Sequence, residues 1–199
     1  PDSKRRALFE LAVASLQSRL ALFKGSNQSA FDLAMQTSDR LRQIVPPATE
    51  AGSVIRDAAV FRDNVLRNAL TTASLAAIRT GRYGEAEAAA RERQTLPPNP
   101  YSELDPRDEK SRAQVTLAHA IVLQGRFADA RQVTETEVAR YRDELQDGAS
   151  GLSFTKDFAY ALYVDALARP AGDSRRAANL AEASKQLDSL SAEANQLLD

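Results

Sequence analysis

The stretch GRYGEA at residues 81–86 recurs, slightly changed, as GRFADA at residues 125–130. Each copy lies between two segments whose apolar residues repeat with helical spacing. The glycine permits the left-handed turn that ends a helix, the aromatic residue wedges into the hairpin, and the final alanine lies where two helices touch. Each copy therefore predicts an antiparallel helical hairpin.

The same pairing of a glycine with an alanine five residues later occurs twice more, at Gly25 and Ala30 and at Gly172 and Ala177. We therefore predict an all-α chain of antiparallel hairpins, with residues 1–199 forming one domain. The expected repeats span residues 3–45, 54–95, 106–146 and 154–189. The expected helices span residues 3–23, 27–45, 54–80, 83–95, 106–124, 127–146, 154–169 and 174–189, and a truncated ninth helix starts within residues 191–199.

Local residues indicate where several of these helices begin and end. Glycines at residues 25, 81 and 125 are placed to end helices in the left-handed conformation. Side-chain caps at the helix starts are expected from four residues. They are Ser53, Asp105, Ser153 and Asp173.

Composition excludes several classes of function. The chain has 199 residues and a formal net charge of −1, which disfavours binding of DNA or RNA through a broad basic surface. It has no cysteine, so a disulfide framework, an iron–sulfur site and a thiol nucleophile are excluded. Its one histidine excludes a histidine-rich metal site, and no apolar run is long enough to span a membrane. The composition is rich in alanine and arginine, which suggests a bacterial source, and the start at Pro1 suggests a fragment.

The turns TGRYGEAEAAA and QGRFADARQV resemble those of the tetratricopeptide repeat (TPR) family. Small residues precede the two turns at Ser74 and Ala118, and Pro98 stands where the family places its terminal proline. The junction glycines are 44 to 56 residues apart, longer than the basic period of about 34, which resembles the kinesin-light-chain type. The resemblance implies a right-handed superhelical array whose first helices line a concave groove.

A candidate partner-binding site lies on the expected helix 106–124. Arg112, Thr116 and His119 follow helical spacing and share one polar stripe. The resemblance to TPR proteins implies that this face of a first helix lines the groove, so we predict that the three side chains contact a partner. The alternative is that His119 is hydrogen-bonded to a neighbouring helix.

TPR proteins that hold the C-terminal carboxylate of a partner use lysine and asparagine side chains on their first helices. The matching places here hold Thr71, Leu75, Val115 and His119, so binding of a C-terminal tail is not supported. No phosphate-binding loop, zinc-protease motif or nucleophile elbow occurs. An enzyme is therefore not expected, and neither a catalytic residue, a metal site nor a cofactor is predicted.

These observations favour a non-catalytic protein–protein interaction scaffold that binds a peptide or a protein surface in its concave groove. The alternative is a ligand-sensing or oligomerising regulatory module of a larger signalling protein. A protein or peptide partner is expected, and a homo-oligomer is compatible with the sequence. Nucleic-acid binding is not expected.

Two further segments have more than one interpretation. Residues 4–6 are basic and begin an amphipathic helix, which is either a juxtamembrane or inter-domain helix or a solvated terminus. Tyr160 and Tyr163, with Phe154 and Phe158, are expected to pack the array rather than to bind a ligand.

Overall fold

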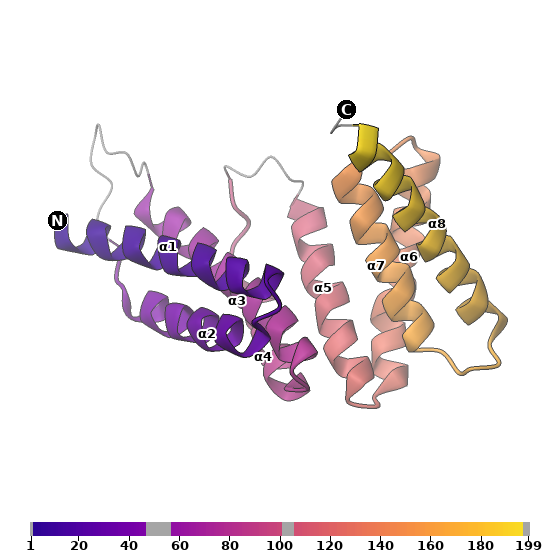
Figure 1. The fold of residues 1–199 in the computed structure, drawn as a ribbon, viewed down its shortest axis with the longest axis horizontal. Coiled ribbons are helices and arrows are strands. Elements are labelled where there is room, and N and C mark those ends of the chain that lie inside the picture. Colours follow the sequence, from indigo (N-terminus) through magenta and orange to yellow (C-terminus); the bar gives the residue numbers. More distant parts are fainter. Residues whose placement is uncertain (1, 47–56, 101–105, 197–199) are drawn as a thin grey trace. The chain divides into compact units, whose positions relative to one another are not determined.

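A computed structural model describes residues 2–46, 57–100 and 106–196, and the described residues form eight α-helices and no strand (Figure 1). The all-α prediction is confirmed. The helices are α1 (Asp2–Phe23), α2 (Asn27–Gln43), α3 (Ala58–Arg79), α4 (Tyr83–Thr95), α5 (Pro106–Leu123), α6 (Phe127–Gln146), α7 (Leu152–Leu167) and α8 (Ser174–Gln196).

Three tight turns have the same geometry. Gly25, Gly81 and Gly125 lie at φ values of +79°, +77° and +80°. At the first turn the Gly25 N–H donates to the Leu22 carbonyl (3.1 Å) and the Ser26 N–H donates to the Ala21 carbonyl (2.9 Å). The other two turns form the same two bonds at equivalent positions, which is the hydrogen-bond pattern of a Schellman motif.

The alanine of each of these turns is fully buried, as the sequence predicts. Ala30, Ala86 and Ala130 have no exposed surface, because each follows its turn by one helical turn and faces the packed side of its helix. The helix ends next to the turns agree with the prediction, and α4 and α6 agree at both ends. The expected wedge of the aromatic residue into the hairpin is wrong after Gly125, because Phe127 is 51% exposed.

The fourth junction is different, and its assignment as an equivalent turn is wrong. Gly172 does not have a positive φ, and Ala177 is exposed. The start of α8 is instead capped by Asp173, whose carboxylate accepts a hydrogen bond from the Arg175 N–H at 2.8 Å. That carboxylate has a lowered pKa, first because of this backbone hydrogen bond and then because of Arg169. The cap at Asp173 is confirmed.

Four other boundary predictions remain, of which two are wrong and two lie outside the described residues. The truncated ninth helix is wrong, because α8 continues to Gln196 and the sequence has neither glycine nor proline after Gly172 to end it. The cap at Ser153 is wrong, because α7 begins at Leu152 with Gly151 as its N-cap. Ser53 and Asp105 lie outside the described residues. The described start of α3 is capped by Asp57, which accepts from the N–H groups of residues 59 and 60.

The chain divides into two compact units, residues 1–113 and residues 114–199, and the division falls within α5. In the first unit α1 packs against α2 and α3, α2 packs against α3, and α3 packs against α4. Its core is made mainly of alanine and leucine side chains. They include Leu8, Leu11, Leu41, Leu66, Leu70, Ala69, Ala73, Ala76, Ala77, Ala86 and Ala90.

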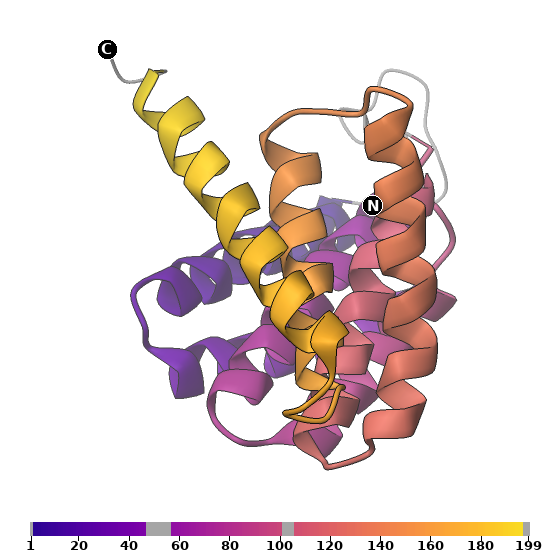
Figure 2. The same cartoon turned by 90° about the vertical axis from the view of Figure 1, so that its right-hand side faces the viewer.

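In the second unit α7 packs against both α6 and α8, and α8 runs back along α7 (Figure 2). The core of this unit includes an aromatic triad, Tyr141, Phe154 and Phe158, with ring centroids 5.5 to 6.1 Å apart. Residues 115, 118, 121 and 122 of α5 pack into the same core. None of the described helices is long and apolar enough to cross a membrane.

Candidate partner-binding site

In the second unit, His119 of α5 contacts two tyrosines of α7. His119 Nδ1 and Tyr160 Oη share a hydrogen bond of 2.8 Å, and the two rings meet edge to face with centroids 5.6 Å apart. The ring of Tyr163 meets His119 edge to face as well, at 5.8 Å. The spacing of 160 and 163 places both tyrosines on one side of α7, so that one histidine can touch both.

Burial of the imidazole lowers the pKa of His119 to about 4, because removal from water disfavours its charged form. The ring is therefore neutral at neutral pH. A neutral imidazole has one N–H donor and one acceptor nitrogen, and Tyr160 already uses Nδ1. The cluster of His119, Tyr160 and Tyr163 thus offers aromatic surface and uncharged hydrogen-bonding groups.

The three residues predicted from the sequence differ in accessibility. Thr116 is only 6% exposed, so its side chain offers little surface to a partner. His119 is half-buried. Its hydrogen bond to Tyr160 of a neighbouring helix agrees with the alternative prediction for this residue. Arg112 is also half-buried and lies on the part of α5 that belongs to the first unit. Contact of these residues with a partner stays a prediction.

The exposed member of the cluster was not predicted as a binding residue. Tyr163 was expected to pack the array, yet its side chain is 41% exposed beside His119. Tyrosine combines a large apolar ring with a polar tip, which makes it one of the residue types enriched at protein interfaces. An exposed tyrosine three residues after another was the sequence signal that could have indicated this surface.

The places of a carboxylate clamp hold no cationic side chain. Thr71 donates its hydroxyl to the Arg67 carbonyl at 2.8 Å, and Val115 is buried in the core. Neither side chain is positioned to bind a terminal carboxylate. Within the described ranges, no group of three His, Asp or Glu side chains could hold a metal ion.

A buried polar network in the second unit joins three helices and was not predicted. The carboxylate of Asp165 on α7 accepts hydrogen bonds from Thr134 of α6 (2.7 Å) and Asn179 of α8 (2.6 Å). It also accepts from Arg169 Nε at 2.6 Å, and this hydrogen bond is the largest cause of the raised pKa of that guanidinium. Arg169 in turn donates to Glu135 at 2.8 Å.

Asp165 and Arg169 are 1% and 6% exposed, and the oxygens of the carboxylate are saturated by their partners. A fully paired, inaccessible carboxylate cannot take a proton from a substrate or bind a ligand. We therefore interpret the network as a structural connection between α6, α7 and α8. Its sequence signal is an acid and a base four residues apart, directly after the apolar run FAYALYV at residues 158–164.

Comparisons with protein-family models, with curated proteins and with solved structures find no match to this chain.

Proposed function

We propose that this chain is a non-catalytic protein–protein interaction scaffold of the TPR-like kind, and that it binds a peptide segment at the surface formed by α5 and α7. The observation that carries the proposal is the cluster of His119, Tyr160 and Tyr163 on the first helices of two successive hairpins. In a right-handed superhelical array these first helices line the concave face. The same hairpin turn, repeated three times, supports an array of this type.

The chemistry of the cluster favours an uncharged segment of the partner. The imidazole is neutral and the other two members are tyrosines, so the cluster itself contributes ring contacts and hydrogen bonds rather than an ion pair. Aromatic rings bind apolar and aromatic side chains, while the second ring nitrogen of His119 and the Tyr163 hydroxyl suit backbone N–H and C=O groups. We expect peptides with one or two large apolar residues between polar ones.

The experiment is a selection of binding peptides from a random displayed library, followed by affinity measurement. Peptides selected on the wild-type chain should bind the Tyr163→Ala and His119→Ala variants at least about 10-fold more weakly, because interface tyrosines are among the residues whose removal has the largest effect. Phe127→Ala is the matched control, since Phe127 is an exposed aromatic (51%) at the start of α6 and is not a member of the cluster.

Circular dichroism and thermal unfolding of each variant separate loss of binding from loss of structure. Selected peptides that bind all three variants with wild-type affinity would place the binding surface elsewhere. A double variant, Arg112→Ala with His119→Ala, tests the stripe predicted from the sequence in the same assay.

The second candidate function, an oligomerising regulatory module of a larger signalling protein, is favoured by a different surface. Helix α1, in the first unit, exposes a row of large apolar side chains.

A further inference from the structure

Helix α1 carries two separate stripes. One stripe is buried against the rest of the first unit and consists of Leu8, Leu11, Ser15, Ser18 and Leu22. The other is apolar, faces solvent and consists of Phe9, Val13, Leu16, Leu20 and Phe23, whose side chains are between 46% and 72% exposed. We call the second set the outer stripe. A helix that packed only against its own unit would need only the buried stripe.

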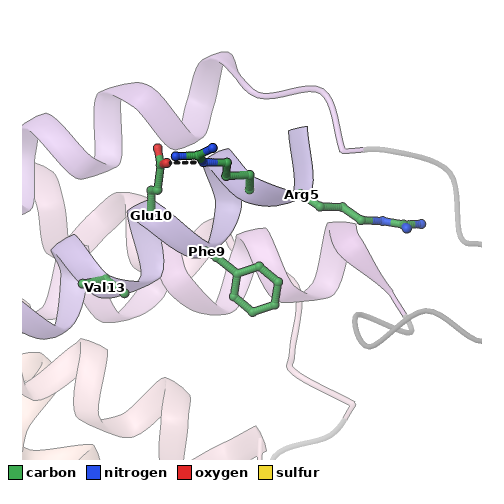
Figure 3. A pocket seen from close by; sticks show the side chains of 5 residues that line it. Arg5, Phe9, Glu10 and Val13 are labelled. Atoms are coloured by element: carbon green, nitrogen blue, oxygen red, sulfur yellow. Dashed lines mark hydrogen bonds and ion pairs between the residues drawn. The ribbon is translucent and has the colours of Figure 1, made fainter. Parts of the chain in front are cut away.

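The N-terminal end of the outer stripe borders a hollow of about 560 Å³ (Figure 3). Phe9 and Val13 project from α1 beside it, and the ring of Phe9 meets Phe61 of α3 with centroids 5.8 Å apart. Arg6 and Glu10, which also line it, form an ion pair at 3.0 Å. Phe9 and Val13 are therefore the apolar part of the wall of this hollow, and Phe9 also contacts α3.

The spacing of the outer stripe fits a helix as its partner. Its five residues follow one another at intervals of four, three, four and three, which is the heptad spacing of a helix that packs along another helix. Val13 and Leu20 then occupy the a positions, and Phe9, Leu16 and Phe23 occupy the d positions. Surfaces that bind an extended strand or a compact loop do not require this period.

We propose that the outer stripe pairs with the same stripe of a second copy of this chain, with the two α1 helices antiparallel. In the register we infer, Val13 of each copy faces Leu16 of the other, and Phe9 faces Leu20. The charges around the stripe determine this orientation.

In a parallel pair, Arg6 lies at an a position and would face Arg6 of the second copy. Arg19 would face Lys24 across the seam, which adds a second repulsion between like charges. In the antiparallel pair, Arg6 faces the ring of Phe23, an aromatic face that already lies under the guanidinium of Arg19 at 5.5 Å and that interacts favourably with guanidinium groups. Glu10 then faces Gln17, so the antiparallel pair avoids the repulsions between Arg6 and Arg6 and between Arg19 and Lys24.

The area of the outer stripe fits a weak dimer, which forms only at higher protein concentration. Taking full areas of about 150–200 Å² for each side chain, the exposed fractions correspond to roughly 500 Å² per copy. Two copies would bury about 1,000 Å² in total, which is near the lower limit for a specific interface. We therefore expect a dissociation constant on the order of micromolar.

Sedimentation velocity measured from about 1 µM to about 100 µM tests the pairing. The wild-type chain should shift from monomer to dimer, and Leu16→Glu should remain monomeric because two carboxylates would face the apolar seam. The matched control is Leu187→Glu on α8, where a leucine is similarly exposed (54% against 65%); this variant should dimerise like the wild type. A wild-type chain that stays monomeric throughout, or a Leu16→Glu variant that still dimerises, would overturn the proposal.

The orientation can be tested separately because the chain has no cysteine. Val13→Cys and Leu16→Cys variants are mixed and oxidised, with Gln28→Cys on an exposed part of α2 as the control. Antiparallel pairing predicts mainly the mixed disulfide, which joins one copy of each variant, whereas homodisulfides in excess would contradict it. Leu16→Glu should leave binding of the selected peptides at Tyr163 unchanged, so this inference and the proposed function can fail independently.

Discussion

The first unit packs its helices mainly through alanine and leucine side chains and pairs Arg67 with Glu109 at 3.5 Å. The second unit adds an aromatic triad and a shorter, more deeply buried ion pair, Asp165 with Arg169 at 2.6 Å. Both units use the same glycine turn, at Gly81 in one and at Gly125 in the other, with the same hydrogen bonds. The turn therefore determines how a hairpin closes but not which side chains the hairpin packs against.

Each unit also has an ion pair between the second helices of its two successive hairpins, and these two pairs are alike. Arg42 of α2 bonds Glu92 of α4 at 2.6 Å in the first unit, and Arg142 of α6 bonds Glu182 of α8 at 2.6 Å in the second. Both pairs are partly exposed, and exposed pairs of this kind contribute about 0–1 kcal/mol. The pair of Asp165 and Arg169 is buried, so its removal has a different consequence.

The largest effect is expected from Asp165→Ala. The substitution leaves Arg169 buried without its main partner and leaves Asn179 and Thr134 without an acceptor, which should lower the free energy of unfolding by about 3–5 kcal/mol. Urea unfolding followed by tyrosine fluorescence measures it, since three of the five tyrosines lie in the second unit. Arg42→Ala in the first unit is the contrast and should cost less than about 1 kcal/mol. Equal losses would mean that burial does not distinguish the pair of Asp165 and Arg169 from the exposed pair of Arg42 and Glu92.

The next effect is a pH dependence that belongs to the second unit. The pKa of His119 is about 4 in the folded chain and about 6.5 when unfolded, so only the unfolded state takes up a proton between these values. This residue therefore has no effect above about pH 6.5, and the free energy of unfolding should fall by about 3 kcal/mol as the pH drops to about 4.

Carboxylates titrate in the lower part of that window, so the measurement compares the wild type with His119→Gln, which keeps a polar group opposite Tyr160. The variant should lose the part of the pH dependence that lies between about pH 6.5 and 5. Proton NMR of the single histidine gives its pKa directly, and a value near 6.5 in the folded chain would contradict the expected burial effect.

A smaller effect separates the equivalent turns from the fourth junction. Ala86→Leu and Ala130→Leu should each destabilise by about 1–3 kcal/mol, because added volume must overpack a fully buried site. Ala177→Leu should change stability by less than about 0.5 kcal/mol, since that residue is exposed. Thermal unfolding of the three variants gives the order, and a cost at Ala177 comparable with the other two would mean that the fourth junction packs like the rest.

The smallest effect is expected at the glycines themselves. No atom lies within 4 Å of a Cβ built at Gly125 or Gly172, so a substitution by alanine introduces no clash at either position. Gly125→Ala should nevertheless cost about 1–2 kcal/mol, because φ there is +80°. Gly172→Ala should be neutral or slightly stabilising. Chemical denaturation of both variants checks this difference, and equal effects would indicate that backbone conformation does not distinguish the two turns.

The helices could be predicted well from the sequence because glycine and proline punctuate them at short range. The bounds of α4 and α6 and the burial of Ala86 and Ala130 follow from local residues alone. The prediction failed at Gly172, since the spacing of a glycine and an alanine does not by itself require a left-handed turn.

The candidate site was harder to predict, because its members come together only through packing. His119 and Tyr160 are 41 residues apart, and Asp165 with its partners Thr134 and Asn179 comes from three different helices. The spacing of Arg112, Thr116 and His119 correctly placed them on one helix but could not show that Thr116 is buried. On α1, the prediction of an amphipathic helix did not show that it carries two stripes, because residues 8 and 9 are neighbours in sequence but lie on different sides of the helix.

The repeated turn also has a consequence for the order of folding. A hairpin closed through Gly81 or Gly125 brings its two helices together across only a few residues, so little chain entropy is lost when it forms. Contacts this local form rapidly, and any hairpin can begin the process. The network around Asp165 needs three helices in place, and we expect it to form last. The turns should therefore control how fast the chain folds, and Asp165 should control how slowly the second unit unfolds.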